Sequence, residues 1–246
     1  YGKQIIWPFS YQINTAKEII LKYFGEIPSS FVGVHMRTLK DAETLRNANP
    51  FIFQKAIDLV SKAGFSCFLV GQNSNYSGIK KSKNVFNTTN LPLSQYQQEC
   101  LQIYIWSHSR FFIGSNSGGT NPPGTFGVPT IWLDYFPVRH SRGLVKDHIL
   151  PKRIYSNKLG RFLNLDELFD ESYLQAQPMH EDPLHFKENG YKLYSCKEDN
   201  LEKSIKDMIY ELKYFGQGVN QEKDDFLVSE LNKNEFTPYK YGRKFY

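Results

Sequence analysis

The chain contains few cysteines, and their spacing excludes one common class of protein. Three occur among 246 residues: Cys67, Cys100 and Cys196. An odd number of widely separated cysteines, with no Cys-x-x-Cys pair, does not fit the disulfide framework of a small secreted domain. Two of the three lie within apolar runs. We therefore expect buried, unpaired thiols and a reducing compartment.

Long apolar runs and a targeting sequence are also missing. No run approaches the ~20 residues that a membrane-spanning helix needs. The first residues, YGKQIIWPF, lack the basic region, apolar stretch and small-residue cleavage site of a signal peptide. We expect no transmembrane segment and a cytoplasmic location, which could include the inner face of the membrane. Because the first residue is not Met, we expect a processed chain or a piece of a longer one.

Neither sign of charge dominates. The sequence has 30 basic and 25 acidic residues, a formal net charge of +5, and its lysines are scattered along the whole length. Nucleic-acid-binding proteins usually concentrate their basic residues in a denser patch, so we expect no nucleic-acid partner. Apolar residues make up 40% of the chain and aromatic residues 15%, which is enough for a sizeable core.

Several well-known catalytic motifs do not occur in the sequence. It contains no Gly-x-Ser-x-Gly, no P-loop and no Gly-x-Gly-x-x-Gly, which disfavours serine-nucleophile hydrolysis, P-loop phosphotransfer and dinucleotide redox chemistry. Histidines 140, 148, 180 and 185 show no metal-ligand spacing with a cysteine or carboxylate. We therefore expect no metal site and no cofactor.

The sequence does show a regular alternation of short apolar runs with helical patterns. Strands are predicted at residues 31–36, 66–71, 84–86, 110–114 and 130–134, and helices at 12–24, 50–63, 93–108 and 198–214. This alternation predicts an α/β, Rossmann-like parallel sheet with helices on both faces. We predict an N-terminal helix or interdomain segment at 1–28, a Rossmann-like domain at 29–155 and a helical C-terminal extension at 156–246.

In an open parallel sheet, ligands bind at the carboxyl ends of the strands. Three predicted strands end in residues that could contact a ligand, and the polar stretch 38–49 should overhang the same edge. The candidates are His35 and Arg37 after the first strand, Gly71 and Gln72 after the second, the loop after Ile113, and Arg46 and Asn47 in the polar stretch.

The loop after Ile113 lies within FFIGSNSGGTNPPGTFGVPTIWLD, residues 111–134. Its small residues would let backbone N–H groups approach an anion closely, and hydroxyls would add donors. A tight strand-to-helix turn that needs glycine for its backbone angles would have the same composition. The spacing alone does not separate the two interpretations.

Arg37 and His35 each allow a functional and a structural interpretation. A guanidinium directly after a buried strand could hold a diphosphate with two parallel hydrogen bonds, or it could pair with Asp41 or Glu43 on the surface. His35 is two residues before Arg37 and would share its face of the strand. It could contact a ligand, carry a proton, or be a core histidine with its hydrogen bonds satisfied.

Taken together, these segments resemble the nucleotide-sugar-binding half of two-domain (GT-B) glycosyltransferases. The strand, Ser-Gly turn, short helix and GVP of residues 111–134 occur in the same order in that half, and heptosyltransferase-like enzymes have a similar Ser-Gly element. The sequence VHMR at residues 34–37 resembles the His-x-Arg of fucosyltransferase-type members. The stretch FQKAIDLVSKAGFSCFLVG (residues 53–71) and LPK (residues 150–152) are similar to a group of bacterial glycosyltransferases of unassigned acceptor.

The resemblance covers about residues 29–155 and implies roles for individual residues. Arg37 would bind the donor diphosphate, and the loop would face the phosphates and ribose without a metal. Arg46, Asn47, Gly71 and Gln72 would line the donor pocket. The loop residues concerned are Ser115, Ser117, Gly118, Gly119 and Thr120. His35, Asp41 and Glu43 are only candidates for the general base, because that group commonly comes from the other half of such enzymes.

The activity implied is transfer of a sugar from a nucleotide diphosphate to an acceptor hydroxyl, in bacterial glycan or polysaccharide synthesis. The partners would be a nucleotide sugar, a glycan or other hydroxyl acceptor, and an N-terminal companion domain in a longer parent chain. Two alternatives remain open. One is a nucleotide-sugar 2-epimerase, although the acidic residues expected after its Ser-Gly-Gly turn are absent here. The other is a nucleotide-sugar-binding module without catalysis.

Overall fold

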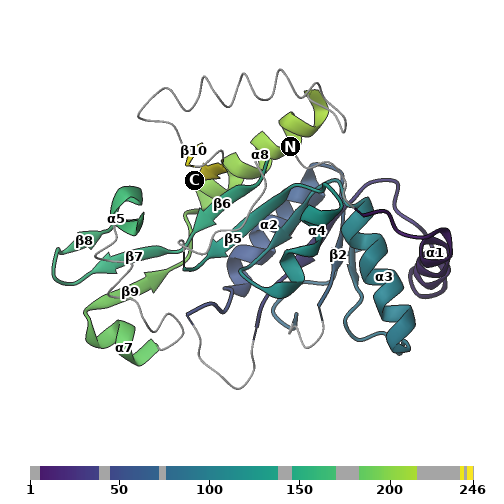
Figure 1. Cartoon of the computed structure of the whole chain (residues 1–246), viewed down its shortest axis with the longest axis horizontal. Helices are drawn as coiled ribbons and strands as arrows, with labels where there is room; N and C mark the ends of the chain where they lie inside the picture. The colour runs from purple at the N-terminus through teal and green to yellow at the C-terminus, as the bar shows by residue number, and fades with distance from the viewer. Residues whose placement is uncertain are drawn as a thin grey trace.

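The computed structural model describes residues 6–38, 45–71, 76–137, 146–169, 183–214, 239–240 and 243–245. Its main feature is an eight-stranded sheet in the order β10-β11-β6-β5-β4-β1-β2-β3, with every neighbouring pair parallel except β10 and β11 (Figure 1). The strands are β1 (Phe31–His35), β2 (Ser66–Leu69), β3 (Val85–Asn87), β4 (Phe112–Gly114), β5 (Thr130–Tyr135), β6 (His148–Pro151), β10 (Tyr239–Lys240) and β11 (Arg243–Phe245). The predicted Rossmann-like parallel sheet is confirmed.

Helices cover both faces of this sheet (Figure 1). On one face α2 (Pro50–Lys62) packs beside α8 (Glu198–Tyr214), and on the other α1 (Ser10–Phe24) packs beside α3 (Gln95–His108). Strand β1 contributes to both layers, because Val32 and Val34 pack toward α2 while Phe31 packs toward α1 and α3. The predicted helices are confirmed with small shifts at their ends.

Local sequence signals fix where the helices begin. The Asn49 side chain accepts a hydrogen bond from the Phe51 N–H (3.0 Å) at the start of α2, where Pro50 occupies the first turn. Ser94 and Gln97 form a reciprocal capping box at the start of α3. Ser94 is therefore the N-cap of α3.

The order of the strands identifies one position in the sheet. The chain runs outward from β1 to β2 and β3, and then returns to the other side of β1 to continue with β4, β5 and β6. The direction of winding therefore reverses between β1 and β4. Ligands of open α/β sheets bind in the crevice that forms at the carboxyl ends of the two strands beside such a reversal.

The chain after residue 155 is less helical than predicted. A small antiparallel sheet, β8-β7-β9, lies beside the main sheet and is covered by α5 (Leu165–Phe169) and α7 (Pro183–Glu188). Its strands are β7 (Arg153–Ser156), β8 (Arg161–Phe162) and β9 (Tyr191–Tyr194). Strands of two to four residues carry too little periodicity to be seen in the sequence. In addition, α8 packs beside α2 and β11 pairs with β6, so both belong to the layers of the main sheet.

The three cysteines are free and buried, as predicted. Among the described residues, no helix has both the length and the apolar composition needed to cross a bilayer.

Candidate site at the carboxyl ends of β1 and β4

The chain segments that follow β1 and β4 are joined by backbone hydrogen bonds. The Ser115 N–H donates to the His35 carbonyl (3.1 Å), and the Arg37 N–H donates to Ser115 Oγ (2.8 Å). Arg37 is therefore held directly beside the loop after β4. The structure brings together His35, Arg37 and Ser115–Thr120 at the position where the winding reverses.

The loop after β4 is held in shape by its two buried hydroxyls. Residues Gly118–Thr120 form a single 3₁₀ turn, and Thr120 Oγ1 donates to the Ser115 carbonyl at 2.7 Å. Ser115 and Thr120 both have no exposed surface. Their side chains therefore brace the loop and do not face the crevice, which differs from the implied ligand-facing role of Thr120.

Three consecutive backbone N–H groups of the loop are available to bind a ligand. Within the described residues, the N–H groups of Asn116, Ser117 and Gly118 make no hydrogen bond to another protein group. Gly118 is exposed, and Ser117 and Gly119 are half-buried. Successive N–H groups of this kind can form a site that suits an anion.

Gly119 lies against the imidazole ring of His35. A Cβ atom at residue 119 would come within 2.8 Å of both Cδ2 and Nε2 of that ring. Real Cβ atoms do not approach other atoms so closely, so this contact requires glycine. Glycine is needed at residue 119 for space and not for backbone conformation, because its φ angle is not in the left-handed region.

His35 is buried, and its pKa is low. Burial, and to a lesser extent the positive charge of Arg37, lower the pKa of His35 from 6.5 to about 4. The imidazole is therefore neutral at pH 7. A base with this pKa is poorly matched to deprotonating a hydroxyl at neutral pH, which weakens the candidacy of His35 as general base.

This low pKa predicts that stability depends on pH. Between pH 6.5 and about 4 the unfolded chain protonates His35 while the folded chain does not, so the free energy of unfolding falls as the pH is lowered through this interval. The contribution amounts to roughly 3 kcal/mol. Urea unfolding of the wild type and of His35→Asn between pH 4 and pH 7 measures it. The variant should show the weaker pH dependence, and parallel curves for the two proteins would contradict the assignment.

The chain segment around Arg46 is tied to the same loop. One guanidinium nitrogen of Arg46, Nη2, donates to the Asn116 carbonyl (3.1 Å), and Asn116 Nδ2 donates to the Phe136 carbonyl (2.7 Å). The Ala48 N–H donates to the Arg37 carbonyl (2.9 Å). Arg46 therefore lies beside the loop after β4, at the carboxyl ends of the strands.

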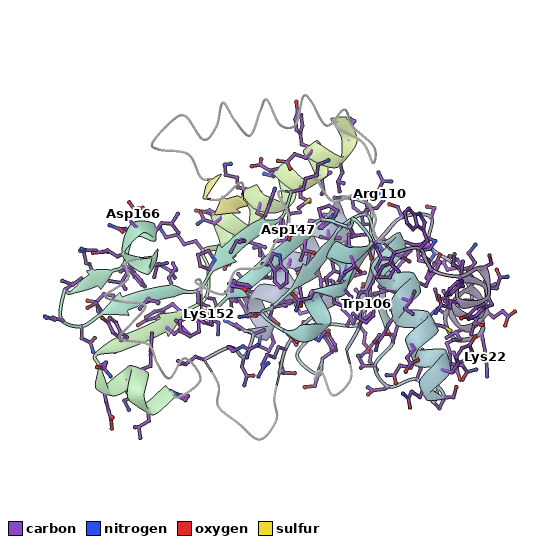
Figure 2. All side chains as sticks on the ribbon, in the orientation of Figure 1. Lys22, Trp106, Arg110, Asp147, Lys152 and Asp166 are labelled. Atoms are coloured by element: carbon purple, nitrogen blue, oxygen red, sulfur yellow. The ribbon has the colours of Figure 1, made fainter. Side chains whose placement is uncertain are left out.

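Lys152, directly after β6, holds the segment around Arg46 in place. Its Nζ donates to the carbonyls of Leu45 (2.8 Å) and Asn47 (2.6 Å) and is only 8% exposed as a residue. Burial lowers the pKa of Lys152, and the charge of Asp134 partly opposes this. Lys152, directly after β6, and Arg110, shortly before β4, lie toward opposite ends of the parallel strands (Figure 2).

Replacing Lys152 by Met is expected to destabilise the protein by about 2–3 kcal/mol, because two carbonyls in a buried setting lose their donor. The matched control is Lys158→Met, which changes an exposed lysine in the turn after β7 and should alter stability by less than about 0.5 kcal/mol. Thermal unfolding of both variants measures the difference. Equal melting temperatures would show that the Lys152 contacts contribute nothing.

The structure describes only some of the remaining residues that were predicted for the site. Asp41, Glu43 and Gln72 lie outside the described residues. Gly71 follows β2 at the same edge and has φ of 120°, a conformation that favours glycine. Asn47 contributes its carbonyl to Lys152.

The sequence analysis missed three residues that organise this edge. Asn116 lies in the loop after β4 among smaller polar residues and has no distinguishing pattern around it. Lys152 lies in the tripeptide LPK, which indicates no contact with the segment around Arg46. Asp134, at the end of β5, has a positive φ of 53° and accepts hydrogen bonds from the Cys196 N–H and the Ser195 hydroxyl, both at 2.9 Å. These bonds hold the segment before α8 against the sheet. The bonded residues Asp134 and Cys196 are 62 positions apart, so no local pattern reveals the contact.

Comparisons with known proteins extend the description of the fold. No protein-family model matches the sequence, and no curated protein matches it. Among solved structures, a family 9 glycosyltransferase from Veillonella parvula DSM 2008 is similar, with a TM-score of 0.52 and 12% identity over 84% of this chain. The match covers 53% of the Veillonella chain, so the present chain spans about half of its length.

A second similar structure is TibC from enterotoxigenic E. coli H10407, a dodecameric, iron-containing glycosyltransferase. Its TM-score is 0.41 and its identity 15%, over 79% of this chain and 49% of TibC. The described residues contain no group of three or more His, Cys, Asp or Glu side chains that could hold a metal ion.

The structural likeness confirms the predicted fold class. The chain has the α/β arrangement found in a solved glycosyltransferase. At 12% identity the likeness concerns the fold alone.

Proposed function

We propose that this chain is the donor-binding part of a glycosyltransferase that moves a sugar from a nucleotide diphosphate to an acceptor hydroxyl. The observation that carries the proposal is the position of Arg37. Its backbone is bonded to Ser115 at the reversal between β1 and β4, beside the N–H groups of residues 116–118. The Arg37 side chain starts beside these donors, and a guanidinium that acts together with successive N–H groups would match the charge of a diphosphate.

In the proposed reaction, the bond between the anomeric carbon and the diphosphate oxygen breaks as the acceptor oxygen attacks that carbon. The diphosphate leaves with the bonding electrons, and its charge increases. Arg37 and the loop N–H groups would stabilise that charge from fixed positions. The acceptor proton goes to a general base. Asp41 and Glu43 remain candidates for the base, and the low pKa of His35 argues against it.

Isothermal titration calorimetry tests the binding part of this proposal. The probes are ADP, GDP, UDP, CDP, dTDP and inorganic pyrophosphate. At least one nucleoside diphosphate should bind with a Kd below about 1 mM, a binding free energy beyond about −4 kcal/mol. Binding of none of the six probes would overturn the proposal.

A product analysis then separates catalysis from its alternatives. The nucleotide sugar that corresponds to the best-binding nucleoside diphosphate is incubated with the chain, with and without a panel of acceptor sugars, and followed by NMR. A glycosyltransferase transfers the sugar when an acceptor is present. A 2-epimerase yields a new nucleotide sugar without any acceptor, and a non-catalytic module leaves the nucleotide sugar unchanged.

A further inference from the structure

His35 carries a ring nitrogen for which the described residues provide no partner. Its Nδ1 lies 3.3 Å from Thr120 Oγ1. The other ring nitrogen, Nε2, makes no hydrogen bond with any described residue. This nitrogen is not sealed from solvent. Nε2 can therefore be reached from outside the protein, although the residue as a whole is only 6% exposed.

The hydrogen bonds of Thr120 determine which nitrogen of His35 carries the proton. A threonine hydroxyl has one hydrogen, and that of Thr120 is donated to the Ser115 carbonyl at 2.7 Å. In its contact with His35, the Thr120 oxygen can therefore only accept. Nδ1 must donate, so the neutral ring bears its proton on Nδ1 and Nε2 presents a lone pair.

The surroundings of Nε2 favour a hydroxyl as its partner. Gly119 has no side chain to cover this edge of the ring. Burial and the charge of Arg37 lower the pKa of His35, so the ring stays neutral and Nε2 stays an acceptor at pH 7. An anionic phosphate oxygen has no hydrogen to donate, whereas a sugar hydroxyl does. A hydroxyl would take the place of solvent at Nε2.

We infer that His35 Nε2 accepts a hydrogen bond from a sugar hydroxyl of the ligand whose diphosphate lies against the neighbouring loop. This inference rests on the proposed function. The hydroxyl belongs either to the ribose or to the sugar attached to the second phosphate. Both have the same chemistry at Nε2, and the test below distinguishes them.

The test compares His35→Asn with His35→Gln by calorimetry. The Asn amide retains a donor near the position of Nδ1 and lacks any atom at Nε2, while the longer Gln can place its carbonyl oxygen near Nε2. The probes are pyrophosphate, the best-binding nucleoside diphosphate and its nucleotide sugar. His108→Asn, at the exposed end of α3, is the matched control.

We expect His35→Asn to weaken nucleotide binding by about three- to tenfold, the effect of one neutral hydrogen bond. Pyrophosphate binding should change by less than twofold, and His35→Gln should regain part of the loss. A loss already seen with the nucleoside diphosphate assigns the hydroxyl to the ribose, and a loss seen only with the nucleotide sugar assigns it to the attached sugar.

Two results would overturn the inference while leaving the diphosphate site intact. One is that His35→Asn weakens the binding of pyrophosphate as much as the binding of the nucleotide, which would mean that His35 acts only through the loop. The other is unchanged binding of both nucleotide probes by His35→Asn. If the wild type binds neither pyrophosphate nor any nucleoside diphosphate, the proposed function itself fails, and this inference fails with it.

Discussion

Gly114→Ala is expected to destabilise the protein by about 2–4 kcal/mol. A Cβ at residue 114 would overlap the side chain of Thr120, which is fully buried. Thr120 can move away only by giving up its hydrogen bond to the Ser115 carbonyl. Overpacking in a core costs about 1–3 kcal/mol, and the lost hydrogen bond adds to it. Urea unfolding measures the change.

Gly118→Ala provides the matched control for this variant, because it lies in the same loop. A Cβ at residue 118 would meet no atom within 4 Å, and its φ angle is not positive. We expect a change in stability below about 0.5 kcal/mol. Equal destabilisation by the two variants would show that the loop is sensitive to any added side chain and that the Thr120 brace has no special role.

Arg37→Ala is expected to weaken binding of a nucleoside diphosphate by about ten- to a hundredfold. Hydrogen bonds from a charged group to its partner contribute about 1.5–3 kcal/mol, and a guanidinium can make two such bonds to one diphosphate. Calorimetric titration of the best-binding nucleoside diphosphate measures the loss. Arg37→Lys should retain part of the affinity, because it keeps the charge but not the two parallel donors.

Arg110→Ala is the control for the general effect of removing a positive charge. Arg110 precedes β4, and its N–H donates to the Phe31 carbonyl. It therefore lies at the amino ends of the strands, whereas Arg37 lies at the carboxyl ends. Its replacement should leave the affinity within twofold of the wild type. If both arginine variants weaken binding equally, Arg37 does not contact the diphosphate.

Much of the fold could be predicted because it depends on local patterns. The apolar run of residues 31–36 and the helical spacing of Phe53, Ile57 and Val60 specify a buried strand and its covering helix. Repetition of such units implies a parallel sheet, whose strand ends lie at one edge. That rule alone placed Arg37 near the loop after β4, and the structure confirms that they are neighbours.

The missing parts depend on contacts between distant residues. Nothing in the sequence near Lys152 indicates that it donates to carbonyls more than 100 residues earlier in the chain. The tautomer of His35 follows from Thr120, which lies 85 residues away. The burial of Thr120 could not be predicted for a related reason: composition shows that a hydroxyl is present in a loop, but only packing shows how deeply it is buried.

A crystal structure of the chain with its best-binding nucleoside diphosphate would test the central claim most directly. The account predicts the two phosphates at the carboxyl ends of β1 and β4, within hydrogen-bonding distance of the Arg37 guanidinium and of N–H groups among residues 116–118. Phosphates bound away from this edge of the sheet, with the loop and Arg37 making no contact to them, would contradict it.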